Sequence, residues 1–162
     1  MKEIPLTNGG IALCDDDDYE MLAQHKWYAW HKATNCPYYA MTNIRVNGHK
    51  TTISMHKCLL GSRGDDEIDH KDNNGFNNQR ANLRFCTKTQ NQANAKLRIS
   101  NKSGYKGVTR NGKNWSASVC LCGRAIHLGT YVTLESAALA YDEAATRYYG
   151  EFALTNKMLG LI

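Results

Sequence analysis

The chain lacks the features that would place it in a membrane or in a disulfide-stabilised scaffold. No apolar run approaches the roughly 20 residues that a helix needs to span a bilayer, and residues 1–5 lack the apolar core of a signal peptide. We therefore expect a cytoplasmic protein with no membrane partner. No two cysteines form a C-x-x-C pair, so neither a zinc ribbon nor a redox motif is indicated. We expect reduced thiols at all six positions, which are Cys14, Cys36, Cys58, Cys86, Cys120 and Cys122.

Acidic residues are missing from a long internal stretch. No Asp or Glu lies between Asp72 and Glu135, although the net charge of the whole chain is only +5. The Lys and Arg residues of this stretch are Arg80, Arg84, Lys88, Lys96, Arg98, Lys102, Lys106, Arg110, Lys113 and Arg124. One interpretation is a solvated basic surface without a partner. The other is a track that binds nucleic-acid phosphates, since Lys and Arg release counterions from them.

The length of 162 residues fits one ordinary domain or two small ones, and only two prolines argue against long disordered regions. In residues 1–62, Asn8-Gly9-Gly10 predicts a hairpin over 4–13, and Asn47-Gly48 predicts another between 38–46 and 50–55. The acidic run 15–18 precedes a predicted helix over 19–27. Acids there favour the helix dipole and one can cap it, which we prefer to a metal site. A short helix over 54–61 is predicted to end at Gly61.

Residues 63–95 predict a compact ββα unit. Two short strands, 67–70 and 83–86, flank a turn-rich loop, and the capping-box pattern Thr87-x-x-Gln90 starts a helix that carries 88–96. Residues 96–103 have no apolar periodicity and form a polar, basic linker.

Residues 104–157 predict a three-stranded sheet with one helix. Strands over 105–110, 114–121 and 125–132 are joined by turns at Asn111-Gly112 and Gly123. Thr133 caps a helix over 134–149 that ends at Gly150. The residues expected to pack on the sheet are Ala137, Tyr141, Ala144 and Tyr148. The other face of the sheet is left uncovered, and it is either solvated or binds something.

Asp69 and His70 offer the groups that phosphodiester hydrolysis requires. A base must activate water and a divalent cation must stabilise charge on the phosphate. Neighbouring strand residues point to opposite sides, so the chain must bend at His70 if both are to reach one target. Asn91 on the following helix can face Asp69. A carboxylate with an amide oxygen suits Mg²⁺, which takes few protein ligands.

The segment EIDHKDNNGFNNQRANLRFCTKTQNQAN, residues 67–94, resembles the ββα-metal motif of HNH endonucleases. The resemblance implies that His70 is the general base, that Asp69 and Asn91 ligate Mg²⁺ (or Mn²⁺), and that Asn82 fixes the loop of His70. The family often has His where this chain has Asn91, which resembles the phage and intron homing branch. Asn94 is an alternative ligand. Arg84 and Lys88 either contact DNA or steady the product phosphate, and His56 either packs or touches the phosphate.

Residues 103–156 resemble an AP2 DNA-binding domain over nearly its full length. The landmarks are Tyr105-x-Gly107-Val108, Trp115, Leu128-Gly129-x-Tyr131, Ala137-Ala138, Ala140-Tyr141-Asp142 and Ala144-Ala145. The family docks its sheet in the major groove, which accommodates a β-ribbon. By position, the residues expected to face DNA are Lys106, Arg110, Lys113, Trp115, Ser118, Arg124 and His127. Trp115 is equally suited to the core, because Ala117 and Val119 share its face if the strand alternates. His127 stands where Trp is usual, and Thr109, Ser118, Cys120 and Ala125 replace strand arginines, so the plant base preference does not transfer.

These patterns together predict an α+β chain of three parts. Residues 1–95 form an N-terminal segment with the HNH nuclease, 96–103 a basic linker whose Lys96, Arg98 and Lys102 follow phosphates, and 104–162 the AP2-like domain. The N-terminal pattern is also similar to the leader of phage AP2-HNH proteins. The expected activity is cleavage of double-stranded DNA as a homing enzyme, by a monomer that nicks or a homodimer, in a bacterial host cytoplasm if phage-encoded. The alternative is a non-catalytic, sequence-specific DNA-binding regulator. RNA is disfavoured because its A-form major groove is too narrow for a sheet.

Overall fold

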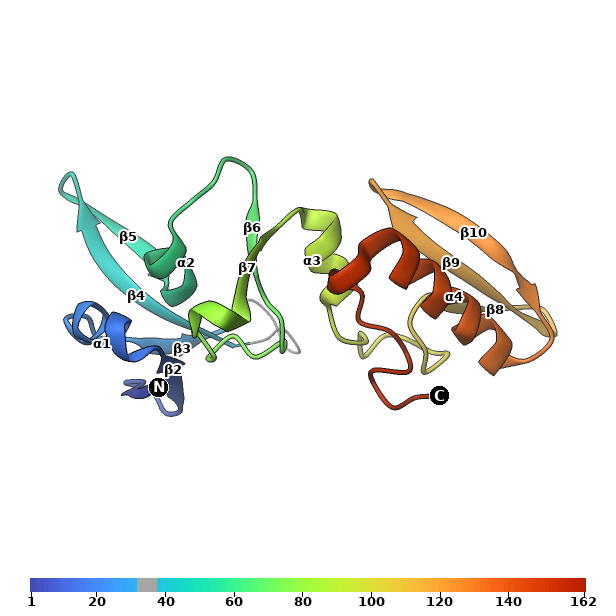
Figure 1. The fold of residues 1–162 in the computed structure, drawn as a ribbon, viewed down its shortest axis with the longest axis horizontal. Coiled ribbons are helices and arrows are strands. Elements are labelled where there is room, and N and C mark those ends of the chain that lie inside the picture. The colour runs from blue at the N-terminus through green and yellow to red at the C-terminus, as the bar shows by residue number, and fades with distance from the viewer. Residues whose placement is uncertain (32–37) are drawn as a thin grey trace. The chain divides into compact units, whose positions relative to one another are not determined.

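The structure is a computed structural model that describes residues 1–31 and 38–162. The fold is mixed, with several small sheets and helices (Figure 1), as the sequence predicts at that level. The described chain divides by its internal packing into two compact units, Met1–Cys86 and Thr87–Ile162. No helix within the described residues is long and apolar enough to cross a membrane. Five cysteines are free thiols as expected, and Cys36 lies outside the described residues.

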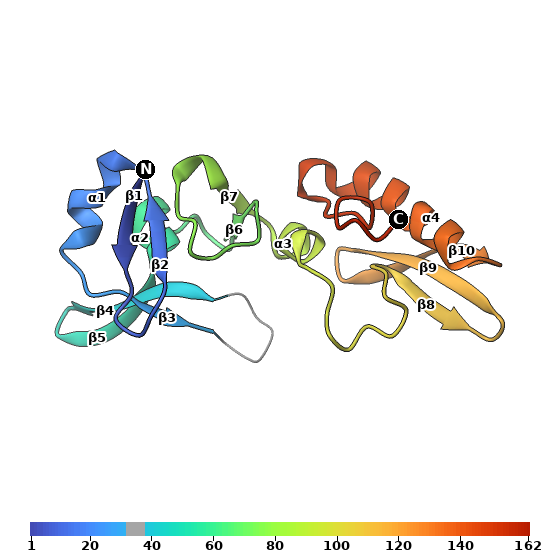
Figure 2. The same ribbon diagram turned by 90° about the horizontal axis from the view of Figure 1, so that it is seen from below.

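In its described residues, 1–31 and 38–86, the first unit has three antiparallel sheets and two α-helices (Figure 2). Strands β1 (Lys2–Pro5) and β2 (Ile11–Cys14) form the predicted hairpin and lead into helix α1 (Asp16–Ala23). Strands β3 (Tyr28–Trp30), β4 (Tyr39–Val46) and β5 (His49–Ser54) form a sheet in that order, followed by helix α2 (Met55–Leu60). Strands β6 (Glu67–His70) and β7 (Leu83–Cys86) pair, with the short 3₁₀ turn η1 (Arg80–Asn82) between them. Trp27, Leu22 and Met55 are fully buried in the shared core.

Two N-terminal predictions are wrong in detail. Helix α1 begins at Asp16, so three residues of the acidic run, Asp16–Asp18, lie inside its first turn, and the N-cap residue Asp15 makes no side-chain cap hydrogen bond. The helix ends at Ala23, and the chain then forms strand β3, which was not predicted because it has only three residues. Acids in the first turn still favour the helix dipole, but their side chains also bond elsewhere, as described below.

The second unit holds a three-stranded antiparallel sheet in the order β10-β9-β8, with helix α4 (Leu134–Tyr149) packed on it. The strands are β8 (Val108–Asn111), β9 (Asn114–Leu121) and β10 (Arg124–Tyr131), and the 3₁₀ turn η2 (Gly150–Phe152) follows α4. Helix α3 (Lys88–Asn94), with the predicted capping box of Thr87 and Gln90, also belongs to this unit. The packing boundary therefore falls one residue before α3, whereas the sequence placed α3 with the nuclease part.

The helix packs on the sheet through small residues. Ala137, Tyr141 and Ala144 are buried as predicted, whereas Tyr148 is 43% exposed and that prediction is wrong. Its neighbour Tyr149 is buried and donates its hydroxyl to the Cys120 carbonyl of β9. Close packing also requires Gly107, which has a φ of +70°, because a Cβ there would lie 1.9 Å from the Tyr141 ring.

Candidate functional site

The loop that follows β6 is fixed by Asn82. Strand pairing places Asp69 opposite Arg84 and His70 opposite Leu83, and the chain turns directly after His70. The Asn82 amide nitrogen donates to Asp72 Oδ1 at 2.9 Å and to the Asn77 carbonyl at 2.8 Å, and its Oδ1 accepts from the Asp72 backbone N–H at 3.1 Å. One side chain thus joins the start of β7 to Asp72 and Asn77 of the loop, and the catalytic role expected for Asn82 stays a prediction.

Asp72 is the acidic partner in this loop. Its carboxylate accepts hydrogen bonds from the backbone of Asn74 and from the side chains of Asn77 and Asn82. Burial raises the pKa of Asp72, but these hydrogen bonds together lower it below the usual value. The loop therefore keeps a fixed negative charge close to the imidazole of His70 at neutral pH.

The His70 imidazole is buried, with 5% of the residue exposed. Its Nε2 lies 3.3 Å from Oδ1 of Asn78, whose amide nitrogen donates to the Phe76 carbonyl at 3.1 Å. Burial lowers the pKa of His70, against smaller raising effects of Asn78, Asp72 and Asp69. His70 is thus neutral near pH 7, which is the protonation state that a general base requires. Sequence reasoning missed the fully buried Asn78, because the loop holds several asparagines and only the fold shows which one reaches the ring.

A second histidine lies beside His70. The ring centroids of His56 on α2 and His70 are 5.0 Å apart in an edge-on arrangement, and the Tyr39 ring lies within 6 Å of both. His56 Nε2 is 2.9 Å from the Ser54 hydroxyl, and its buried Nδ1 has no hydrogen-bond partner among the residues that the structure describes. Burial, and less strongly the charges of His70 and Lys57, lower the pKa of His56 to about 3. His56 therefore packs in the interior as a neutral ring.

We expect this burial to make the first unit sensitive to mild acid. Unfolded His56 takes up a proton near pH 6.5, whereas the folded state does so only near pH 3, so stability falls as the pH drops through this window. Between pH 7 and pH 5, His56 alone should cost about 2 kcal/mol of unfolding free energy. Urea unfolding at both pH values measures the loss. The variant His56→Gln should lose about 2 kcal/mol less unfolding free energy between pH 7 and pH 5 than wild type, whereas the exposed control His49→Gln should lose as much as wild type. An equal loss in wild type and His56→Gln would show that His56 is not the cause.

Asp69 is held by Arg84 across the strand pair. Asp69 Oδ2 accepts a hydrogen bond from Arg84 Nε at 2.9 Å and lies 2.8 Å from Nη2 in an ion pair, and the exposed fractions of the Asp69 and Arg84 side chains are 5% and 11%. Arg84, a predicted DNA contact, thus bonds a predicted metal ligand. Among residues 1–31 and 38–162, no group of three or more His, Cys, Asp or Glu side chains is placed to hold a metal ion. The predicted donors Asp69 and Asn91 are hard oxygen ligands that fit Mg²⁺ or Mn²⁺ chemically. Asn91 lies on α3 in the other unit, and its approach to Asp69 stays a prediction.

The N-terminal acidic run supports the same loop. Asp15 accepts from the Arg80 backbone N–H at 2.8 Å and from Gln79 Nε2 at 3.2 Å. The buried carboxylate of Asp18 pairs with the Arg80 guanidinium at 2.7 and 2.8 Å. The expectation that one of these acids caps α1 through its side chain is therefore corrected for Asp15, which bonds a segment 64 and 65 residues away in the chain.

The sheet of the second unit has one face toward α4 and one open face. Val108, Ala117 and Val119 are buried under the helix, so alternate residues lie on the other side. Cross-strand pairs place Thr109, Ser116 and Thr130 in one row of that open face, and Ser118 and His127 in the next. His127 Nδ1 lies 3.1 Å from the Ser116 hydroxyl. These five open-face residues carry no formal charge with His neutral.

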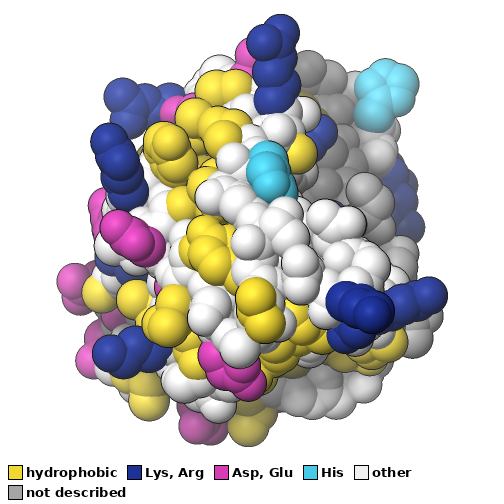
Figure 3. All heavy atoms as spheres, turned by 90° about the vertical axis from the view of Figure 1, so that its right-hand side faces the viewer, with side chains coloured by type: hydrophobic (Ala, Val, Ile, Leu, Met, Phe, Trp, Pro, Cys, Tyr) yellow, Lys and Arg dark blue, Asp and Glu magenta, His cyan; other side chains and the backbone are white. Residues whose placement is uncertain are grey.

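The predicted DNA-binding residues of this unit fall into two groups. Trp115 is half-buried and packs against the cluster of Val108 and Ala117, with the Arg110 guanidinium 4.7 Å from its ring. Lys106 is buried, so its ammonium does not lie on the open face. The exposed members of the set are Lys88, Lys96, Arg98, Lys102, Arg110, Lys113, Arg124 and His127. In Figure 3, Lys and Arg side chains stand mainly toward the margins of the view, around a largely uncharged middle.

Comparison with known proteins identifies relatives for both parts. No protein-family model matches the chain. An uncharacterized HNH endonuclease of Acanthamoeba polyphaga mimivirus is 31% identical over 150 residues, which cover 93% of this chain and 76% of the relative. The AP2-like ethylene-responsive transcription factor TOE2 of Arabidopsis thaliana is 38% identical over 38% of this chain, and the match spans 13% of the relative. The ethylene-responsive transcription factor WRI1 of the same plant is 45% identical over 33% of this chain, and the match spans 14% of the relative. The chain belongs to the HNH endonuclease family and combines its HNH part with an AP2-like part.

Proposed function

We propose that the protein is a divalent-metal-dependent endonuclease that hydrolyses a phosphodiester bond in double-stranded DNA. The observation that carries the proposal is the buried imidazole of His70 directly after Asp69, in a loop whose ends are joined by hydrogen bonds of Asn82 and whose Asn78 lies against the ring. The family membership supports the same activity.

Each proposed group has a separate task. His70 takes a proton from the attacking water, and Asn82 keeps the loop in place during that transfer. Asp69 and Asn91, or Asn94 in its stead, would hold Mg²⁺ or Mn²⁺. When bound, the ion would stabilise negative charge on the phosphate and the leaving oxygen. Because Arg84 bonds Asp69 in this structure, we propose that Arg84 shares or releases that carboxylate and contacts a phosphate when DNA and the ion are present.

DNA binding is proposed for the second unit. Its exposed Lys and Arg residues attract phosphates in an acid-free stretch of chain, and its open sheet face is free of the helix. The similarity to plant AP2 factors supports DNA as the partner. We propose that the second unit locates a DNA site and that the nuclease part cuts near it, as a homing endonuclease of phage type. A non-catalytic DNA-binding regulator is the competing function, and the intact set of Asp69, His70, Asn82 and Asn91 favours the nuclease.

Removal of the metal provides the direct test. We expect purified protein to convert supercoiled plasmid to nicked circles in Mg²⁺ or Mn²⁺, to stop in EDTA, and to resume when the ion is restored. Gel electrophoresis over time measures the conversion, and duplex RNA added as competitor should not slow it as duplex DNA does. Absence of any cutting across varied DNA sequences, with tight DNA binding retained, would favour the regulator instead.

A further inference from the structure

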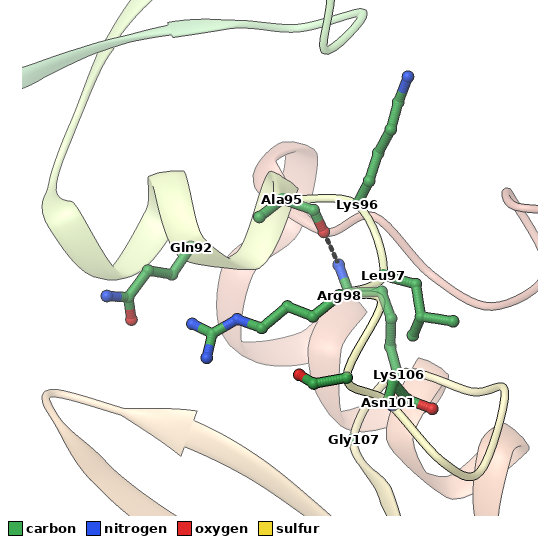
Figure 4. Close-up of a pocket in the computed structure, with 9 residues that line it drawn as sticks. Gln92, Ala95, Lys96, Leu97, Arg98, Asn101, Lys106 and Gly107 are labelled. Carbon is green, nitrogen blue, oxygen red and sulfur yellow. Dashed lines mark hydrogen bonds between the residues drawn. The ribbon is translucent and has the colours of Figure 1, made fainter. Parts of the chain in front are cut away.

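The buried ammonium of Lys106 lies at the C-terminal end of α3. Its Nζ donates to the carbonyls of Ala93 and Ala95 at 2.7 and 2.8 Å, and only 9% of the residue is exposed. Figure 4 shows the side chain reaching up to Ala95, with Arg98 beside it, and both residues line a pocket of about 290 Å³. The last carbonyls of a helix have no partner within the helix and carry partial negative charge. A cation at this position therefore stabilises the end of α3.

The backbone of Lys106 is fixed just as firmly. Its N–H donates to Asn156 Oδ1 at 2.7 Å, and its carbonyl accepts from Asn156 Nδ2 at 3.2 Å. The fully buried Asn156 is in turn bonded to Asp142 of α4 at 2.9 Å. A chain of buried hydrogen bonds thus runs from α4 through Asn156 and Lys106 to the end of α3.

Apolar packing holds α3 in the same place. Ala93 is buried in the cluster that contains Tyr141 and Ala145 of α4, and its carbonyl also accepts from the Leu154 backbone N–H at 3.3 Å. Burial lowers the pKa of Lys106 to about 8, against a smaller raising effect of Asp142, so most of the charge remains at neutral pH. A buried cation of this kind is stable only if its bonds offset its desolvation.

We propose that Lys106 is a positioning residue of the nuclease, which fastens α3, and with it Asn91, to the AP2-like unit. The inference rests on the proposed function for the role of Asn91, whereas the fastening itself does not depend on that role. Under this proposal the second unit has two tasks. It binds DNA, and it holds the helix that carries the proposed metal ligand Asn91. The ammonium of Lys106 is then engaged within the protein and does not contact a phosphate, contrary to the expectation from family position.

The test compares three variants of the full chain. Lys106→Met removes the ammonium from the buried site, Lys157→Met removes an exposed charge from the same unit as a matched control, and Lys102→Met removes a proposed phosphate contact. Hydrogen exchange of peptides that cover 88–95 is expected to speed up about tenfold or more in Lys106→Met alone. The salt dependence of DNA affinity should stay unchanged in Lys106→Met and fall by about one charge in Lys102→Met.

Nicking assays measure kcat, the Mg²⁺ dependence and the KM for DNA separately, and a smaller amount of folded protein would not change the Mg²⁺ dependence. In Lys106→Met, kcat should fall and the Mg²⁺ concentration for half-maximal rate should rise, with the KM for DNA unchanged, and Lys106→Arg should recover part of the rate. Unchanged exchange over 88–95 would overturn the fastening, and a lowered salt slope with intact α3 would return Lys106 to the phosphate contacts. If Lys106→Met unfolds the unit, Lys106→Gln, which keeps one donor, is judged by the same readouts. If wild type cuts no DNA, the proposed function fails while exchange still decides the fastening.

Discussion

Replacement of His70 by Ala is expected to lower the nicking rate by roughly 10²–10⁴-fold, the usual contribution of a positioned general base. The buried imidazole is neutral near pH 7 and is therefore ready to accept a proton from water. DNA affinity should stay near that of wild type, because the proposed phosphate contacts lie elsewhere. Single-turnover nicking of a supercoiled plasmid in Mg²⁺ measures the rate, and gel shifts in EDTA measure the affinity.

The control for this prediction is His49→Ala. His49 is an exposed histidine at the start of β5 in the same unit, and it has no proposed role. Equal nicking by His70→Ala and wild type would remove His70 from the chemistry and would point to a contaminating nuclease. Loss of rate in both histidine variants would show that the assay reports damage to the unit and not loss of the base.

Replacement of Asp69 by Asn should abolish metal-dependent nicking and also destabilise the first unit. The change removes the only carboxylate among the proposed metal ligands, and it breaks the ion pair of Asp69 with the 11% exposed guanidinium of Arg84. Breaking a buried ion pair from one side typically costs about 3–5 kcal/mol. Urea unfolding measures the stability, and binding of Mn²⁺ followed by electron paramagnetic resonance measures the loss of the ligand.

Arg84→Met separates the two effects. It breaks the same buried ion pair from the other side and should lower stability comparably. It retains the carboxylate, so Mn²⁺ binding should persist or become tighter. Metal binding that is equal in Asp69→Asn and wild type would contradict the assignment of Asp69 as a ligand, whatever the stability data show.

The elements that local chemistry specifies could be predicted from the sequence. The turn at Asn47-Gly48 and the caps Thr87 and Thr133 are set by residues only a few positions apart, and the structure confirms them. The hairpin predicted at Asn111-Gly112 is also present, but its turn lies one residue later, at Gly112-Lys113. The three strands and the helix of the second unit follow with nearly the expected bounds. Asp69, His70 and Asn82 are close in sequence, which allows a spacing pattern to identify them.

The missed features depend on contacts between distant segments. Asp18 lies 62 residues from its partner Arg80, and no local pattern links them. The same holds for the packing of Tyr39 and His56 against His70, because three separate elements meet there. Tyr148 fits the helical repeat, yet Tyr149 takes the buried place at the end of α4. Burial at such positions is decided by the tertiary fold and not by periodicity.

Because the open face of the sheet is uncharged, the residues that could distinguish DNA sequences differ from the residues that attract DNA. Ser116, Ser118, Thr130 and their neighbours offer hydroxyl groups and methyls, which can distinguish base edges but supply little long-range force. The force that draws a polyanion toward this surface then comes from the flanking lysines and arginines. In a DNA complex formed through this face, ionic strength would set the rate of association, while the uncharged rows of residues would set the sequence preference.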